Sequence, residues 1–377
     1  MKLRRASIPI LSLLTLAAPL AVALDFSFEG PRFNFLLAGG LPVPAGGDLK
    51  LLFPLGVSPL SVSLFLGAGY QDRYLLRDAA TGDPIAAQNE DNEGSVYAPG
   101  RNAFHSPNAQ WDLGLVAALP PGDGRLLAFA YWRGRLDANL NDLPTLVFRD
   151  VQGLFGNSLF VGAAWDDVRT DGRRVKAGRF AEASAEWAPP GLASAEVDYL
   201  RLDLQCRAFV PLFTRGDGDL NLVSSYLALL AQADWTTGSA MPLHVFQYFG
   251  GRAARKGLGG SVRGYPSQAW DAAFKAVANM EVRVLGPAFF GLPWAMPLAY
   301  GFLDAGLYSG LPGAGADRAS AAGFVASTGG GIALNLLDFA QAGFMAGILL
   351  PGDDPLYPVY LPGGEKSFFS IEFLLHF

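Results

Sequence analysis

Residues 274–284 read FKAVANMEVRV, and their alternation decides the fold class. The even positions are all apolar, while the odd positions include Lys275, Asn279, Glu281 and Arg283. A period of two over this length predicts a β-strand with one apolar and one charged face. The stretch is also about as long as a tilted strand that crosses a bilayer. We expect the apolar face to meet lipid and the charged face to line an interior. A half-buried strand of a soluble sandwich is the alternative.

The same alternation recurs along the chain. Residues 200–208 place Leu202, Leu204 and Cys206 on one face and Arg201 on the other. Turn sequences such as Pro-Gly-Asp-Gly at 121–124 separate these segments. The strand candidates are 26–38, 48–56, 60–76, 109–119, 125–137, 158–168, 174–188, 196–210, 220–236, 272–286, 297–309, 322–333, 338–350 and 366–377. The pattern predicts an all-β fold, a transmembrane antiparallel β-barrel.

The beginning of the chain has the pattern of an export signal. A basic start with Lys2 and Arg4 leads into an apolar stretch at 8–20, and Ala-Val-Ala at 21–23 fits a cleavage site. We therefore expect a signal peptide at 1–23 and a barrel at 24–377; a retained N-terminal anchor is the alternative. Hydrophobic residues make up 51% of the chain and mean hydropathy is +0.25, without a long apolar run. A closed barrel is the solution for such an exported chain, because it satisfies every backbone hydrogen bond between strands.

The last segment carries a separate signal. Its apolar face ends on a terminal aromatic and comprises Phe369, Ile371, Phe373, Leu375 and Phe377. A final amphipathic strand with a terminal aromatic is typical of the assembly signal of outer-membrane barrels. The physical reason is that this strand must close the barrel against the first strand. The edge strand of a sandwich is the alternative.

Two motifs carry a family resemblance. A glycine-rich loop, Gly-Gly-Ser-Val-Arg-Gly-Tyr at 259–265, precedes the 274–284 strand, and Phe-Leu-Asp-Ala-Gly follows at 302–306. Together they resemble the Val-Arg-Gly-Phe/Tyr and Phe-x-Asp-x-Gly motifs of the BamA/TamA/FhaC superfamily, also called the bacterial surface antigen family. The resemblance covers 255–377. The loop motif comprises Gly260, Val262, Arg263, Gly264 and Tyr265, and the strand motif contributes Phe302, Asp304 and Gly306.

The resemblance implies an inward-folded loop before the fifth-last strand, with Arg263 paired to Asp304 on the barrel wall. Glu281 is a second candidate acceptor for this arginine, and Arg283 could instead neutralise Glu281. The family also implies sixteen strands rather than fourteen, with a hidden hairpin in 139–157. Members usually carry periplasmic polypeptide-transport-associated (POTRA) domains before the barrel. We find no such pattern and expect this chain to lack them.

The implied function is that of an outer-membrane barrel that inserts or translocates polypeptides, or handles lipid. It would act through a weak seam between the first and last strands and through the loop plug. The expected partners are outer-membrane lipid or lipopolysaccharide, a client polypeptide or periplasmic partner protein, and the barrel assembly machinery. Two alternatives remain open. One is a passive pore for small solutes, and the other is a structural surface antigen acting through an irregular loop at 78–108.

Other function classes lack their motifs. The three histidines, His105, His244 and His376, have no nucleophile or metal-ligand spacing around them, and no phosphate loop is present. We therefore expect no enzymatic activity, no cofactor and no metal. A net charge of −6 argues against nucleic acid. Arg252 belongs to a small basic patch that we expect to touch lipopolysaccharide, lipid phosphate or interior carboxylates.

Overall fold

The structure is a computed structural model of the whole chain, and the statements below concern the part of it that is described. The described residues are 25–29, 33–36, 45–54, 60–74, 103–120, 125–138, 153–171, 175–192, 197–217, 220–242, 244–245, 248–252, 257–265, 272–292, 295–309, 322–336, 340–350 and 366–375. None of the helices in these ranges is long and apolar enough to span a membrane.

Almost all of the described chain is β-strand. The strands are β1 (Asp25–Glu29), β2 (Phe33–Leu36), β3 (Ala45–Pro54), β4 (Leu60–Tyr74), β5 (Ala103–Ala118), β6 (Leu126–Ala138), β7 (Gly153–Asp166), β8 (Arg169–Asp171), β9 (Val175–Ala188), β10 (Asp198–Arg215), β11 (Val223–Ala240), β12 (Phe274–Leu285), β13 (Ala295–Ser309), β14 (Ala322–Leu336), β15 (Ala340–Leu350) and β16 (Ser367–Leu375). The helical elements are α2 (Leu258–Ser261) and a 3₁₀ turn, η1 (Phe289–Gly291).

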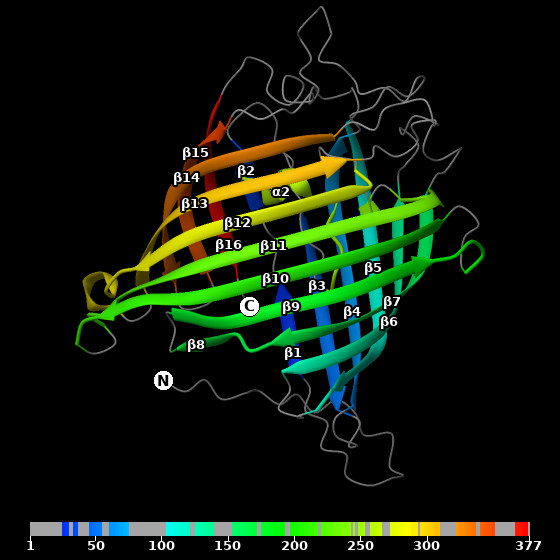
Figure 1. The fold of residues 1–377 in the computed structure, drawn as a ribbon, viewed down its shortest axis with the longest axis horizontal. Helices are drawn as coiled ribbons and strands as arrows, with labels where there is room; N and C mark the ends of the chain where they lie inside the picture. The colour runs from blue at the N-terminus through cyan, green and yellow to red at the C-terminus, as the bar shows by residue number, and fades with distance from the viewer. Residues whose placement is uncertain are drawn as a thin grey trace, which may run out of the picture.

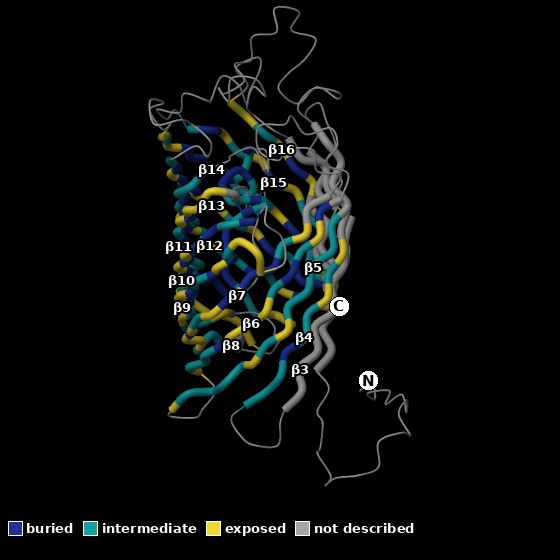
Figure 2. The backbone as a smooth tube through the Cα atoms, turned by 90° about the vertical axis from the view of Figure 1, so that its right-hand side faces the viewer, coloured by how far each residue is buried: buried dark blue, intermediate teal, exposed yellow. Residues whose placement is uncertain are grey.

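These strands form one antiparallel sheet. Its path runs β1-β3-β4-β5-β6-β7-β9-β10-β11-β12-β13-β14-β15-β16-β2, and the short β8 pairs with β9 beside it. From β3 to β7 and from β9 to β16 each strand pairs with the next one in the chain, as in an up-and-down meander. The sheet curls, so that β3–β5 and β9–β11 lie on opposite sides of the molecule (Figures 1 and 2). The path begins at β1 and ends at β2, which only residues 30–32 separate in the chain.

The strands coincide closely with the alternating segments of the sequence. β2 and all of β1 except Asp25 fall within the single candidate 26–38, and each of the other candidates contains most of one strand. The irregular region expected at 78–108 is shorter than predicted, because β5 already begins at Ala103, which pairs with Tyr74 of β4. Within the proposed hairpin at 139–157, residues 153–157 belong to β7. Residues 139–152 lie outside the described part, as do the expected signal peptide at 1–23, the terminal Phe377 and most of the loop at 78–108.

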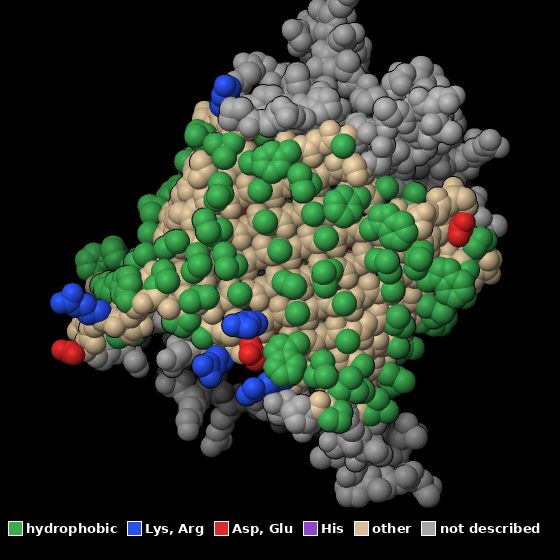
Figure 3. Space-filling model, in the orientation of Figure 1, with side chains coloured by type: hydrophobic (Ala, Val, Ile, Leu, Met, Phe, Trp, Pro, Cys, Tyr) green, Lys and Arg blue, Asp and Glu red, His purple; other side chains and the backbone are tan. Residues whose placement is uncertain are grey.

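The two faces of the sheet are chemically opposite, and the apolar face points outward. Along β10, Leu202 and Leu204 are 43% and 54% exposed, whereas Arg201 and Asp203 are each 5% exposed. Cys206 is exposed on the same outer face as the leucines. Apolar side chains spread over the visible strand surface, and the charged ones shown there lie toward its margins (Figure 3). This arrangement inverts that of a soluble protein and is the one that suits a lipid environment.

Candidate functional site

The interior of the curled sheet is occupied by a chain segment between β11 and β12. We call residues 248–252 and 257–265 the inner segment. Its second part contains α2, a single helical turn in which the Val262 amide donates to the Leu258 carbonyl at 2.9 Å. The sequence predicted an irregular glycine-rich loop here, and the structure has one turn of helix within it. This turn contacts β12 and β13.

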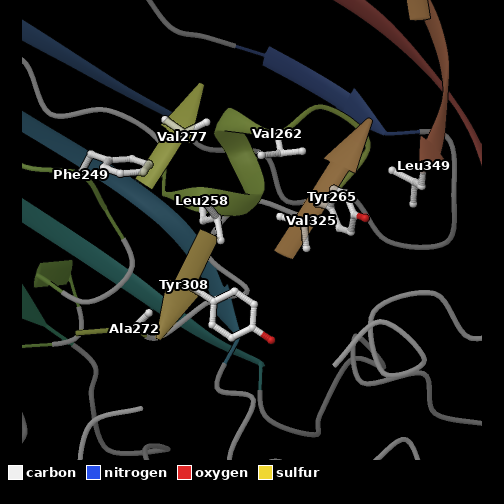
Figure 4. Packing of buried hydrophobic residues seen from close by; sticks show 9 residues of the cluster. All are labelled: Phe249, Leu258, Val262, Tyr265, Ala272, Val277, Tyr308, Val325 and Leu349. Carbon is white, nitrogen blue, oxygen red and sulfur yellow. The ribbon is translucent and has the colours of Figure 1, made fainter. Parts of the chain in front are cut away.

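Apolar side chains fasten the inner segment to the wall. Leu258, Val262 and Tyr265 are buried in one cluster with inward-pointing residues of four strands and with Phe249 from the first part of the segment. The wall contributes Val277, Tyr308, Val325 and Leu349 to this cluster (Figure 4). The cluster closes the space between the segment and β12–β15, so the segment is packed against the sheet.

Arg263 makes a two-pronged pair with Asp304 of β13. Its Nε donates to Asp304 Oδ2 at 2.6 Å, and its Nη2 donates to Asp304 Oδ1 at 2.8 Å. The backbone amide of Arg263 donates to the same Oδ2 at 3.1 Å. Such bidentate geometry fixes the plane of the guanidinium as well as its position. Asp304 is fully buried, so its carboxylate oxygens must find their hydrogen-bond donors within the protein.

The remaining contacts of Arg263 come from neighbouring wall residues. Its Nη1 lies 2.6 Å from Glu281 Oε1, and its guanidinium carbon lies 3.8 Å above the centre of the Phe302 ring. Glu281 also binds Arg283, through Oε2 at 2.6 Å from Nε, so this carboxylate serves both arginines. Asn279 joins the group by donating to Asp304 Oδ1 at 2.8 Å and to the Ser261 carbonyl at 2.7 Å. The structure thus brings together the acceptors that the sequence left as alternatives.

The electrostatic balance at Arg263 favours its charged form. Burial of the guanidinium lowers its pKa, but the hydrogen bond and charge of Asp304, aided by Glu281, outweigh this effect and raise the pKa above its usual value. Arg263 is therefore a permanent cation inside the sheet. It can hold the inner segment by charge at any physiological pH.

Two glycines permit the close approach of segment and wall. Gly264 has a φ of +89°, and a Cβ there would lie 2.3 Å from Phe368 Cδ1. At Gly306 of β13 a Cβ would lie 2.6 Å from Leu258 Cδ1. Gly301 of the same strand takes no part in this approach, because it has the parity of Leu303 and is exposed on the outer face. Gly260 lies in the helical turn.

A second set of contacts, which motif reasoning missed, holds the first part of the inner segment. Asp234 of β11 is fully buried and lies between Arg201 of β10 and Lys275 of β12. Asp234 Oδ2 accepts from Arg201 Nε at 2.6 Å and from the Gly250 amide at 2.7 Å, and Oδ1 accepts from Lys275 Nζ at 2.9 Å. Arg201 and Lys275 in turn donate to the carbonyls of Tyr248 and Val245. The alternation of β10 and β12 indicated that Arg201 and Lys275 point inward, but not that they meet at Asp234.

Arg252 continues this second set of contacts toward β9. Its backbone amide and its Nε donate to Glu182 at 2.8 Å and 2.6 Å, and Glu182 is buried. Its guanidinium carbon also lies 4.9 Å from the centre of the Phe129 ring. Of the three ligands expected for the basic patch, Arg252 binds the interior carboxylate. A glycine-rich turn makes this possible, because at Gly251, with φ +97°, a Cβ would lie 3.2 Å from Glu182 Oε1.

Beside the inner segment the described interior holds a small cavity of about 90 Å³, lined by residues including Arg133, Arg135, Glu186 and His244. Its charges are paired: Arg133 Nε donates to Asp112 Oδ1 at 3.0 Å, and Arg135 Nε donates to Asp137 Oδ2 at 2.8 Å. The described residues contain no cluster of His, Cys, Asp and Glu suited to a metal ion. The arrangement is therefore one of mutual charge neutralisation.

A solved structure shares this arrangement of strands. It is the crystal structure of BamA from Haemophilus ducreyi lacking POTRA domains 1–3. The similarity has a TM-score of 0.52 and covers 94% of this chain and 70% of that chain, at 13% sequence identity. At that identity the likeness concerns the fold, and it supports a BamA-like β-barrel architecture. No protein-family model matches this chain, and no curated protein matches it.

The last strand lies where the sequence expected it, between β15 and the beginning of the chain. In β16, Phe369 and Ile371 are 44% and 37% exposed on the outer face. Phe373 and Leu375 belong to the same strand. β16 pairs with β2 over four positions, from Ser370 opposite Leu36 to Phe373 opposite Phe33. In the described part of the chain this is a much shorter ladder than that between β10 and β11.

Proposed function

We propose that this chain is an outer-membrane β-barrel of the insertase or translocator type, whose interior is plugged by the inner segment. The observation that carries the proposal is the Arg263–Asp304 clamp inside a sheet that resembles the BamA barrel. In this proposal β1 and β2 form one interrupted strand, which closes the sheet by pairing with β3 on one side and β16 on the other.

The distribution of side chains supports a membrane location. Leucine, valine and tryptophan side chains are exposed on the outer face, and charged side chains are buried on the inner face. Antiparallel strands that pair with both neighbours satisfy their backbone hydrogen bonds within the sheet, which a spanning structure requires in lipid. Contact with outer-membrane lipid or lipopolysaccharide follows from this placement.

The filled interior argues against a passive pore. Two separate groups of carboxylates, Asp304 with Glu281 and Asp234 with Glu182, bind the two parts of the inner segment. The cavity beside it holds paired charges rather than a ring of one sign that would select an ion. A barrel whose centre is filled by a firmly bound plug is poorly suited to conduct solutes. It is better suited to an activity that takes place at its wall.

The short ladder between β16 and β2 supports an activity in which the wall of the barrel opens. An opened edge exposes unpaired N–H and C=O groups that can template the strand of a client polypeptide. A ladder of four positions loses few hydrogen bonds when it opens. We infer that the client, or a lipid, is handled at this seam, and that a periplasmic partner protein recruits the client.

Locking the seam tests the function. In a Cys206→Ala background, a cysteine pair at Phe35 and Ile371, which lie opposite one another, would cross-link β2 to β16. The protein is reconstituted into phospholipid vesicles, and folding of an unfolded outer-membrane barrel added to them is timed. We expect the reduced protein to accelerate folding of the client several-fold and the oxidised protein to lose this effect.

The matched control is a cysteine pair at Leu204 and Ala233, which lie opposite one another in the long β10–β11 ladder. Oxidation of that pair leaves the seam free and should leave the acceleration intact. If the reduced protein gave no acceleration, or if locking the seam made no difference, the insertase proposal would be wrong.

A further inference from the structure

The turn between β12 and β13 exposes an aromatic pair. Phe289 and Phe290 lie in η1, with their ring centres 4.4 Å apart. Phe289 is 50% exposed and Phe290 is 86% exposed. The turn is nevertheless well formed, because the Leu292 amide donates to the Phe289 carbonyl at 3.0 Å and the Ala288 amide donates to the Leu220 carbonyl at 2.8 Å. The two rings are thus held out by a fixed backbone.

The backbone of this turn does not explain the choice of phenylalanine. Phe290 has φ 52° and ψ 28°, and Gly291 has φ 69°, so both central residues have positive φ, as in type I′ turns. Such turns favour Asn-Gly, and positive φ is a genuine outlier for a bulky residue. Phe290 is the one non-glycine residue with positive φ in the described part of the chain. A strained, exposed aromatic of this kind indicates a role for the side chain itself.

The aromatic pair is continuous with the apolar end of a neighbouring hairpin. From Val210 onward both faces of β10 are exposed, and a bulge between Pro211 and Phe213 leaves two successive apolar side chains exposed. The exposed large apolar residues at the end of β10 and in the two connections are Val210, Leu212, Phe213, Leu220, Phe289 and Phe290. Arg215 is exposed at the end of the same strand, and Asp217 is exposed beyond it. We call the six apolar residues with Arg215 the foot.

We propose that the foot sits in the lipid interface of the leaflet at this end of the strands. The phenyl rings would lie at the boundary of headgroups and acyl chains, and Arg215 would reach lipid phosphate. Apolar surface of this kind, with its charged group at the tip, matches the polarity gradient of a bilayer surface. The foot also continues the apolar outer face of β10 and β12, which includes Leu204 and Met280. The inference rests on the proposed membrane location.

A single-label experiment tests the depth of the foot. Cys206 is the only cysteine in the chain and is exposed midway along β10, so it can report the bilayer interior in the unchanged protein. In a Cys206→Ala background, Phe290→Cys places the label in the foot and Asp217→Cys places it at the tip. Each protein is folded into vesicles of phosphatidylethanolamine and phosphatidylglycerol and labelled with an environment-sensitive fluorophore. Quenching is measured with aqueous iodide and with lipids that carry a nitroxide near the headgroup or near the chain end.

We expect iodide to quench the label at 290 several-fold less than the label at 217, and the shallow nitroxide to quench it more than the deep one. The label at 206 should show the reverse preference between the nitroxides. Equal iodide quenching at 290 and 217, with Cys206 still quenched by lipid, would overturn the foot and leave the membrane location standing. Iodide quenching at Cys206 itself would overturn both. If Phe290→Cys folds poorly, Phe289→Cys carries the label with the same expected outcomes.

Discussion

Arg263 and Asp304 meet edge to edge, and the same carboxylate also accepts the backbone amide of Arg263. Asp304 therefore fixes both the side chain and the local path of the chain. A neutral or reversed partner would lose more than one hydrogen bond. Asp304 alone accepts three hydrogen bonds from Arg263, and this makes it a sensitive place to test the plug.

Two substitutions of Asp304 should distinguish the contribution of its charge from that of its size and shape. Asp304→Arg places two cations together beside the buried ring of Phe302 and should release the inner segment. Complete loss of one partner of a buried ion pair destabilises a protein by about 3–5 kcal/mol. Asp304→Asn should destabilise this protein by less, because asparagine keeps one acceptor oxygen. Protease protection of residues 250–270 in the folded protein measures the release. Glu281→Gln is the mild control, since Arg263 keeps Asp304. Equal effects of the two Asp304 substitutions would remove the pairing hypothesis.

Asp234→Asn should cost more than Asp304→Asn, because Asp234 neutralises two buried cations, although no motif marks it. Asp234→Asn removes the countercharge of Lys275 and Arg201, which are 0% and 5% exposed, and weakens the acceptor of the Gly250 amide. We expect destabilisation of about 3–5 kcal/mol, because two buried cations lose their partner. The denaturant dependence of heat-modifiable migration measures it. Asp217→Asn, at an exposed position, should change nothing, and a similar loss in both variants would contradict the interpretation.

Gly264 and its control, Gly191, test whether close packing at Gly264 holds the inner segment in place. Both have positive φ, +89° and +82°, so an alanine at either incurs about 1–2 kcal/mol of backbone strain. Only at Gly264 does the added Cβ meet another group, Phe368 Cδ1 at 2.3 Å. Gly264→Ala should therefore lose protease protection of the inner segment, while Gly191→Ala should lose only a little thermal stability. Equal behaviour would mean that the contact with Phe368 does not hold the segment.

Gly306 and Gly301 provide the same comparison on the wall, within β13. Gly306→Ala drives a Cβ to 2.6 Å from Leu258 Cδ1, whereas at Gly301 the nearest atom is the Gly329 carbonyl oxygen at 3.9 Å. Overpacking costs about 1–3 kcal/mol, so Gly306→Ala should loosen α2 while Gly301→Ala is neutral. The rate of hydrogen exchange of the 258–262 amides measures this loosening directly. Protection that stays unchanged in Gly306→Ala would show that α2 does not need the space.

The strands were predictable because their signal is local. Alternation in β10 and β12 assigned Arg201 and Lys275 to the inner face, and a period of two leaves little freedom in that choice. The motif around Arg263 likewise pointed to Asp304. Asp234 escaped notice because its partners come from two other strands and from the Gly250 backbone, and no local pattern encodes their meeting.

Strand parity was enough to assign the side chains that face inward, because it is a property of each segment alone. The local sequence also marked the loop that carries Arg263. The three-dimensional arrangement was needed to establish that Asp234 lies between Arg201 and Lys275 and that Arg252 meets Glu182. Those facts depend on the register between strands and on the path of the inner segment. Both are set by turns and by packing across the whole sheet.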